Sequence, residues 1–382
     1  MRKACIPCSG FGGMNVKRRV LLVVFLLTLA ILSSTASAAL KILPEMELLA
    51  GVLTQTTWME RRGPRGPGNE YYRALKEFFA EYENHEAVSI ARRLTERGFT
   101  YDAPPAFICH LGPLPELPLL VEYNDYLVER AGGRDVLEEF RLALVDLAEQ
   151  SNFLAFFSSW EAYLDECLQP AREDFRAELP QMWLEEFFGW APTRFELIMA
   201  PSMFPGGGYG VTVWDGQGEP AAIQIIREYG SSSGAPEFPT GSDLEMLTIH
   251  ELGHSFVNPT LEAYPERARK LRPLFWSVRK VMRAQAYPFT STFLNEQVVR
   301  SVEVLAARDL FGPELAEIVL ENHEGSGFYL TAFVAEQLDY YQAHRSLYPT
   351  FRDFAPYLFD QLEAYVEENC TFWERFFSLF LR

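Results

Sequence analysis

The run SDLEMLTIHELGHSFVNP, residues 242–259, has the residue types and spacing of a metal site for hydrolytic chemistry. It contains an HExxH motif at residues 250–254. Because residues four apart on a helix lie about one turn above each other, the imidazoles of His250 and His254 reach one point in space. Two neutral imidazoles suit Zn²⁺, and the Glu251 carboxylate beside the metal's open position suits a base that takes a proton from bound water. The motif predicts His250 and His254 as ligands of one zinc ion per chain and Glu251 as general base.

The residues around the motif predict a buried helix with marked ends. Ser242 and Glu245 have the spacing of a capping box, and Asn258-Pro259 is expected to stop the helix. Buried imidazoles need hydrogen-bond partners or a metal, since leaving them unpaired costs free energy. The alternative to a metal site is therefore a helix with two hydrogen-bonded core histidines, or a site that has lost its activity. Apolar stripes that should bury the helix are formed by Met246, Ile249, Leu252, Phe256 and Val257.

A catalytic zinc site usually has three protein ligands, so a third ligand must come from elsewhere in the chain. The extended HExxHxxGxxH pattern is absent, because valine and threonine stand where glycine and the third histidine would be. A helix expected at residues 291–310 places Glu296, Arg300 and Glu303 on one face between apolar flanks. We expect Glu296 to complete the site and Arg300 to pair with Glu303; without a metal, Glu296 and Arg300 would form a surface ion pair. The solvent side of this helix is expected at Gln297, Ser301 and Arg308.

The elements that must position these residues are mostly helices. Helical patterns before the motif lie at residues 45–59, 70–83, 85–97, 134–150 and 153–168. Short β-type runs at 195–200, 210–214 and 221–226, separated by glycine and proline, predict a small antiparallel sheet just before the motif helix. Further helices are expected at 263–285, 291–310, 313–322, 328–346, 350–367 and 372–381. The order indicates a mostly helical α+β fold, with a helical N-terminal part at 39–185 and a catalytic part at 186–382.

The first 38 residues have the pattern of a signal peptide. An apolar run at residues 20–32 follows Lys17-Arg18-Arg19 and precedes small residues that end at Ala38. The run is short for a membrane span, so we expect cleavage after Ala38 and export, with an uncleaved signal anchor as the alternative.

The charge of the chain limits the classes of partner. Its 34 basic and 52 acidic residues give a net charge of −18. Removal of residues 1–38 takes five basic residues and leaves 29 against 52, a net charge of −23. Such acidity disfavours nucleic acid and anionic membrane surfaces as partners. The expectation of a peptide or protein substrate rests on the metal motif and not on the charge.

The motifs also carry a family resemblance. HELGH followed by Asn295-Glu296 on a later helix resembles the gluzincin metallopeptidases, the thermolysin-like class in which a glutamate completes the zinc site. HELGHSFVNP and NEQVVRS, with GFYLTAF at 327–333 and LYPTFRDF at 347–354, resemble the exported bacterial family catalogued as domain of unknown function 4932, as do the runs at 44–49 and 84–88. The resemblance implies His250, His254 and Glu296 as ligands and Glu251 as base. However, 41 residues separate His254 from Glu296, more than in thermolysin-like enzymes, so Glu303 and His323 stay open as alternatives.

These observations lead to one functional hypothesis and one rival. The hypothesis is an exported zinc metallopeptidase whose substrate lies extended along residues 210–214 or 221–226. The rival is a non-catalytic binding or scaffold protein with a structural metal or a degenerate site. A structural zinc is enclosed by four protein ligands, whereas a catalytic zinc keeps a position for water.

Overall fold

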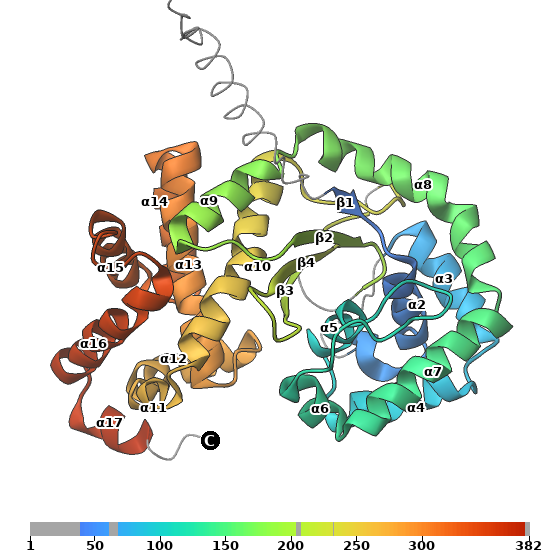
Figure 1. Cartoon of the computed structure of the whole chain (residues 1–382), viewed down its shortest axis with the longest axis horizontal. Coiled ribbons are helices and arrows are strands. Elements are labelled where there is room, and N and C mark those ends of the chain that lie inside the picture. Colours follow the sequence, from blue (N-terminus) through green and yellow to red (C-terminus); the bar gives the residue numbers. More distant parts are fainter. Residues whose placement is uncertain (1–38, 61–67, 204–207, 232, 379–382) are drawn as a thin grey trace, which may run out of the picture. The chain divides into compact units, whose positions relative to one another are not determined.

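Most of the described chain is helical, as the sequence pattern predicts (Figure 1). The structure is a computed structural model that describes residues 39–60, 68–203, 208–231 and 233–378. The predicted signal peptide, residues 1–38, lies outside the described residues. Before the main strands the helices are α2 (Pro44–Leu53), the 3₁₀-helix η1 (Thr57–Glu60), α3 (Glu70–Ala80), α4 (Glu86–Arg97), α5 (Ala103–Cys109), α6 (Asp125–Ala131), α7 (Arg134–Gln150), α8 (Phe153–Asp174) and α9 (Glu178–Phe188). After them come α10 (Gly241–Glu262), α11 (Pro265–Lys270), α12 (Arg272–Ala284), α13 (Thr290–Phe311), α14 (Pro313–Gly325), α15 (Thr331–Ala343), α16 (Phe351–Asn369) and α17 (Phe372–Ser378).

A four-stranded sheet precedes α10, as predicted, but it is mixed rather than antiparallel. Its strands are β1 (Leu40–Lys41), β2 (Phe195–Ala200), β3 (Gly208–Val213) and β4 (Ala221–Arg227), in the order β1-β2-β4-β3. Strand β2 pairs in parallel with both β1 and β4, and only the β3–β4 pair is antiparallel. The two-residue strand β1 has no signal in the sequence. Since β3 pairs with β4 and not with β2, β4 lies inside the sheet and β3 lies at an edge.

The sheet lies between two hydrophobic cores. Side chains alternate along each strand, so Leu197 and Met199 of β2 enter one core and Ile198 and Ala200 enter the other. The first two pack with α10 and later helices, and the second two pack with helices α2 to α8. Helix α10, which contains the HExxH motif, thus lies directly on one face of the sheet (Figure 1).

Helix α2 carries a carboxyl group into the core that Ile198 and Ala200 enter. Glu47 is fully buried between apolar neighbours of the same helix. Burial raises the pKa of Glu47 to about 8, although the neighbouring polar groups of Ser202 and Tyr71 act in the opposite direction. The Glu47 carboxyl group is therefore mostly protonated in the folded protein at neutral pH.

Helix α10 begins and ends at residues other than those predicted. It starts after Thr240, and no capping box forms. The Glu245 carboxylate is fully buried and accepts hydrogen bonds from Arg176, at 2.8 Å from Nε and 3.1 Å from the backbone amide. Pro259 does not end the helix, which continues to Glu262. A proline this close to the end removes only one hydrogen bond of the helix, and the packed last turn tolerates that loss.

Helix α13 is covered on the side that was expected to face solvent. Gln297 and Ser301 are buried against α15, where they lie 3.0 and 3.1 Å from the hydroxyl and carbonyl oxygens of Thr331. Both polar side chains have partners, which explains how they can be buried. Arg308 lies nearer the surface and pairs with Asp339 at 2.9 Å. The sequence thus locates the helix correctly but not its solvent side.

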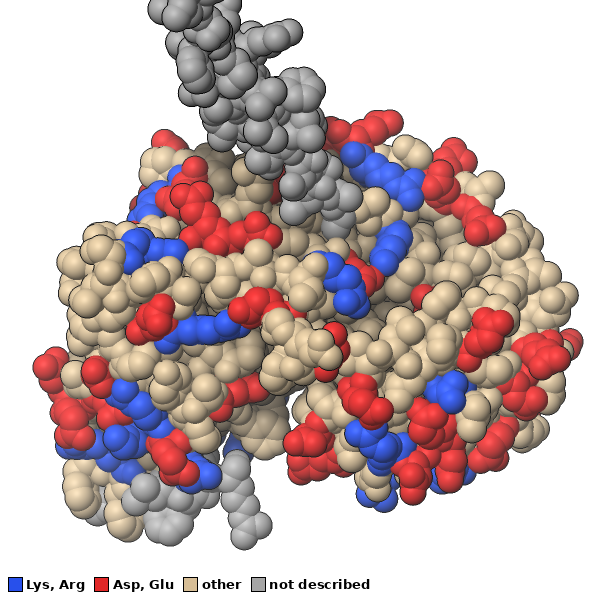
Figure 2. Space-filling view, viewed as in Figure 1, with Lys and Arg blue, Asp and Glu red and all other residues tan. Residues whose placement is uncertain are grey.

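On the face drawn in Figure 2, uncharged residues cover most of the surface, and Asp and Glu are more frequent than Lys and Arg. On this face, Lys and Arg side chains lie among Asp and Glu rather than forming one broad basic patch. No helix among the described residues is long and apolar enough to cross a membrane.

Candidate metal centre

The site lies where α13 runs along the histidine-bearing side of α10. The side chains of His250 and His254 are 12% and 11% exposed, so this side of α10 is nearly but not fully covered. Gly253 faces Val299 at the centre of the contact, with Glu303 beside His250 and Glu296 beside His254. Later residues of α13 therefore meet earlier residues of α10, so the two helices are antiparallel. This crossing brings His254 and Glu296, which are separated by 41 residues in the chain, to one point.

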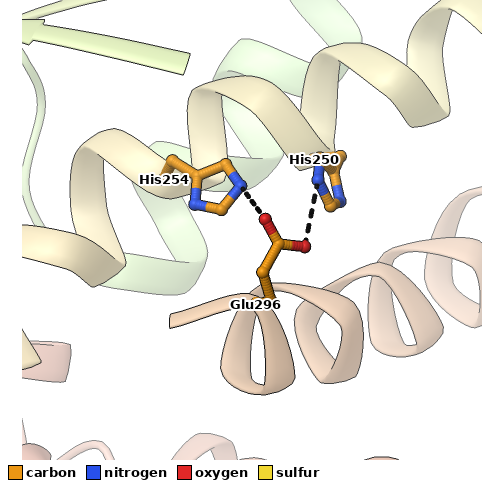
Figure 3. A group of neighbouring side chains, drawn as sticks. All are labelled: His250, His254 and Glu296. Carbon is orange, nitrogen blue, oxygen red and sulfur yellow. Dashed lines mark ion pairs between the residues drawn. The ribbon is translucent and has the colours of Figure 1, made fainter. Parts of the chain in front are cut away.

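His250, His254 and Glu296 form a group that could hold a metal ion (Figure 3). His254 Nε2 lies 3.3 Å from Glu296 Oε1, and His250 Nε2 lies 3.7 Å from Glu296 Oε2. All three ligand atoms lie within 4.8 Å of one another. Ligands about 2.0–2.1 Å from a tetrahedral zinc are separated by roughly 3.4 Å, which matches these spacings. Glu296 Oε2 is also buried, and its closest cationic neighbour is the Arg300 guanidinium at 3.1 Å.

Both imidazoles are anchored through the ring nitrogen that faces away from this point. His250 Nδ1 lies 3.0 Å from Glu303 Oε2, and His254 Nδ1 lies 3.1 Å from Asn258 Oδ1. Because both partners are acceptors, each Nδ1 carries a proton, so Nε2 is the nitrogen of each ring that would bind a metal in place of a proton. The structure thus gives Glu303 the role of orienting His250, whereas the sequence left it as an alternative ligand.

Arg300 lies beside Glu296 rather than beside Glu303. Its guanidinium lies 3.1 Å from Glu296 Oε2, 3.1 Å from His323 Nδ1 and 3.4 Å from the hydroxyl of Tyr287. The expected Arg300–Glu303 pair is therefore wrong. Besides His250, the group that lies 3.0 Å from Glu303 Oε2 is His323 Nε2. His323 is not part of the ligand group and instead connects Glu303 with Arg300.

The ionisation of these groups reflects their mutual charges. Burial by itself would lower the pKa of His250, but the charges of Glu303 and Glu296 outweigh burial and raise it to about 9. Burial would raise the pKa of Glu296, but its contact with His254 and the charge of Arg300 bring it down to about 2. The two glutamates are ionised at neutral pH. Their negative charges favour a cation beside them, either a proton on His250 or a bound metal ion.

Glu251 lies between the ligand helix and the edge of the sheet. It is 6% exposed, and burial raises its pKa. A methyl group on Gly208 of β3 would lie 2.4 Å from Glu251 Oε1, and one on Gly210 would lie 2.0 Å from the Glu251 carbonyl oxygen. The absence of side chains at these two positions lets β3 touch α10 at the residue predicted as base.

Three residues at or near this site have little or no signal in the sequence. Asn258 could have been found as the polar residue one turn after His254. Tyr287 and Asp102 offered no comparable pattern. Asp102 precedes α5 in the N-terminal part, and the His254 charge lowers its pKa against the stronger, opposite effect of burial. Helix α5 of the N-terminal part packs against β3, the strand that touches α10 at Glu251, although no chemistry was expected from this part.

Comparison with known proteins identifies a family but no activity. A family model described as "Domain of unknown function (DUF4932)" matches residues 66–360. The matched span includes the motif helix, the whole of α13 and His323. No curated protein and no solved structure matches the chain.

Proposed function

This chain belongs to the DUF4932 family, and from its metal centre we propose that it is an exported zinc-dependent hydrolase, most specifically a peptidase of the gluzincin type. The observation that carries the proposal is the convergence of two Nδ1-anchored imidazoles on one carboxylate. Export rests on the signal-peptide pattern at residues 1–38.

Zinc is the metal that fits this set of donors. Two imidazole nitrogens and one carboxylate are usual zinc ligands, whereas calcium and magnesium prefer oxygen ligands alone. His250, His254 and Glu296 would hold the ion. When bound, zinc polarises a substrate carbonyl and lowers the pKa of water, the chemistry needed for peptide hydrolysis.

Three protein ligands favour a catalytic over a structural site. Among the described residues, the metal-binding group contains no fourth His, Cys, Asp or Glu. A fourth coordination position is then open to water or substrate. This observation supports the enzyme over the binding or scaffold protein.

Glu251 is the group assigned to proton transfer. It follows His250 directly in the motif and is not in the ligand group. Its raised pKa suits a carboxylate that accepts a proton from water and passes it to the leaving amine. Arg300 contacts both Glu296 and the hydroxyl of Tyr287, which makes Tyr287 a candidate donor to a substrate oxygen.

Strand β3 is the proposed backbone partner of the substrate. It is at the edge of the sheet and lies against α10 at Glu251 and His254. An extended peptide that pairs with this edge would pass close to the ligands. The other strand considered, β4, is wrong for this role because it lies inside the sheet.

The test combines metal analysis with a variant of the base. Purified protein should contain one zinc per chain and cleave members of a peptide library. Glu251→Gln should retain zinc but lose at least about 100-fold in kcat/KM, because general base catalysis contributes that much. Glu317→Gln, on the exposed side of α14, is the matched control and should behave like wild type. A protein that binds no transition metal, or a fully active Glu251→Gln variant, would refute the proposal.

A further inference from the structure

A cavity of about 310 Å³ lies at the end of the α10–α13 contact that is nearer to Glu296 than to Glu303. Its apolar walls come from four segments, namely the last turn of α10, α11, the residue before α13 and the first turn of α13. The apolar lining residues are Leu261, Pro265, Ala268, Phe289 and Leu294. The Phe289 side chain is 54% exposed, so a large apolar group stands at the surface beside the cavity.

The cavity continues the two helix faces that carry the ligands. On α10, His254 is followed at intervals of four by Asn258 and Glu262, and Glu262 lines the cavity. On α13, Leu294 and Asn295 line the cavity and directly precede Glu296. Leu261 lies seven residues after His254, about 10 Å along the helix. An extended peptide covers that distance in about three residues, so one substrate bound at the metal centre can also reach the cavity.

The polar groups of the lining do not specify a charged ligand. Glu262 and Asn295 are neighbours, and Asn295 lowers the pKa of Glu262 against the stronger, opposite effect of burial. Arg269 pairs with Glu266 at the surface. The carboxylate of Glu262 opposes the guanidinium of Arg272, so neither sign of charge prevails in the lining. Binding in this cavity is most favourable for an apolar group, because such a group displaces water from the leucine, proline and phenylalanine side chains of the lining.

We propose that this cavity is a specificity pocket that binds a large apolar side chain, of leucine, methionine or phenylalanine, within about three residues of the cleaved bond. The inference rests on the proposed peptidase function, since it names the substrate class of that same site. The cavity is lined by the same helices as the ligands, and filling it fixes the register of a peptide over Glu251.

The first test fills the pocket. Ala268 lies on the short helix α11 and lines the cavity, so Ala268→Phe places a ring inside it. Leu142→Phe, at a 56% exposed position of α7, adds the same ring far from the centre in sequence and serves as the control. A peptide library should show wild type preferring large apolar residues at one position. The ratio of kcat/KM for Phe over Ala at that position should fall about 10- to 100-fold in Ala268→Phe and stay unchanged in Leu142→Phe.

The second test removes part of the wall without filling the pocket. Phe289→Ala should lower the same ratio by a smaller factor, and zinc content should equal that of wild type in all three variants. A wild-type library profile without an apolar preference would overturn the inference, as would an Ala268→Phe variant that lowers kcat/KM equally for Phe and Ala peptides. A change in oligomeric state in Ala268→Phe would also overturn it and assign the pocket to a second copy of the chain.

A binding measurement separates failure of the pocket from failure of the enzyme. If the zinc-loaded protein cleaves no peptide, the proposed function fails, and saturation-transfer NMR with N-acetyl-phenylalaninamide then tests the pocket alone. Binding of this probe to wild type and Leu142→Phe but not to Ala268→Phe would support an apolar side-chain pocket. Equal binding to all three proteins, or binding to none, would refute it.

Discussion

Replacing Glu303 by glutamine tests the most specific feature of the centre, the carboxylate that holds His250 from behind. Glu303 Oε2 accepts a hydrogen bond from His250 Nδ1 over 3.0 Å. The amide of glutamine can still accept this bond but carries no charge. A hydrogen bond to a charged group contributes about 1.5–3 kcal/mol and a neutral one about 1 kcal/mol, so the change should weaken zinc binding by about 1–2 kcal/mol. That corresponds to roughly 5- to 30-fold, within or slightly below the 10- to 100-fold usual for residues that orient a metal ligand.

The assay is competition for zinc against a fluorescent chelator at fixed pH. Glu303→Gln should raise the zinc Kd by the factor above, Glu296→Gln should raise it much more because it removes a ligand, and Glu317→Gln should leave it unchanged. Zinc affinity of Glu303→Gln equal to that of wild type would show that the His250 contact does not support the metal. A loss as large as that of Glu296→Gln would show that Glu303 itself is a ligand.

Three further predictions concern other parts of the chain. Glu47 ionises at about pH 8 in the folded protein against 4.5 ordinarily, so wild type should lose stability as pH rises between these values, by at most about 5 kcal/mol. Urea unfolding should therefore show Glu47→Gln more stable than wild type at pH 8.5 and similar at pH 4; equal curves at pH 8.5 would contradict the assignment. Gly210→Ala should lower the free energy of unfolding by at least about 1–3 kcal/mol, because its methyl group would lie 2.0 Å from the Glu251 carbonyl oxygen. Gly253→Ala, whose methyl group would meet Val299 at an ordinary 3.6 Å, should be neutral or stabilising by up to about 1 kcal/mol, and a larger loss there than at Gly210 would refute the packing argument. Asn258→Leu should weaken zinc binding about 10-fold or more in the same chelator competition, since His254 Nδ1 loses its acceptor; unchanged affinity would count against that role.

Local patterns in the sequence predict the bounds of a helix or strand well where the residues of that segment alone determine its structure. Strand β2 has the predicted bounds of residues 195–200, and α7 those of residues 134–150. The pairing of strands depends on segments far apart in the chain, which explains why the sheet is mixed although an antiparallel one was expected. Similarly, the Ser242–Glu245 spacing suggests a cap, but Arg176, 69 residues earlier, binds Glu245 instead.

In the candidate centre, too, the residues of a local motif could be predicted from the sequence, and those that depend on contacts between distant segments could not. The HExxH spacing is local, so His250, Glu251 and His254 could be placed from sequence alone. Glu296 and Glu303 share one face of α13, and the sequence could not separate their roles. The structure does so through the antiparallel crossing with α10, which sets Glu296 against the Nε2 atoms and Glu303 against the opposite nitrogen of His250. Tyr287 joins Arg300 at the centre through tertiary packing alone, for which a single sequence gives no pattern.

The two histidine anchors differ in origin, and this difference bears on how the protein unfolds. Asn258 belongs to the same helix as His254, so that pair stays together as long as α10 is intact. Glu303 and Glu296 both belong to α13, so separation of α13 from α10 removes the His250 anchor and the third ligand in one step. A metal bound at this point would act as a non-covalent cross-link that closes the chain segment between α10 and α13. The binding energy of the metal would then oppose the separation of these two helices. Removal of the metal by a chelator would change unfolding from one cooperative transition to one that starts with the separation of α13 from α10.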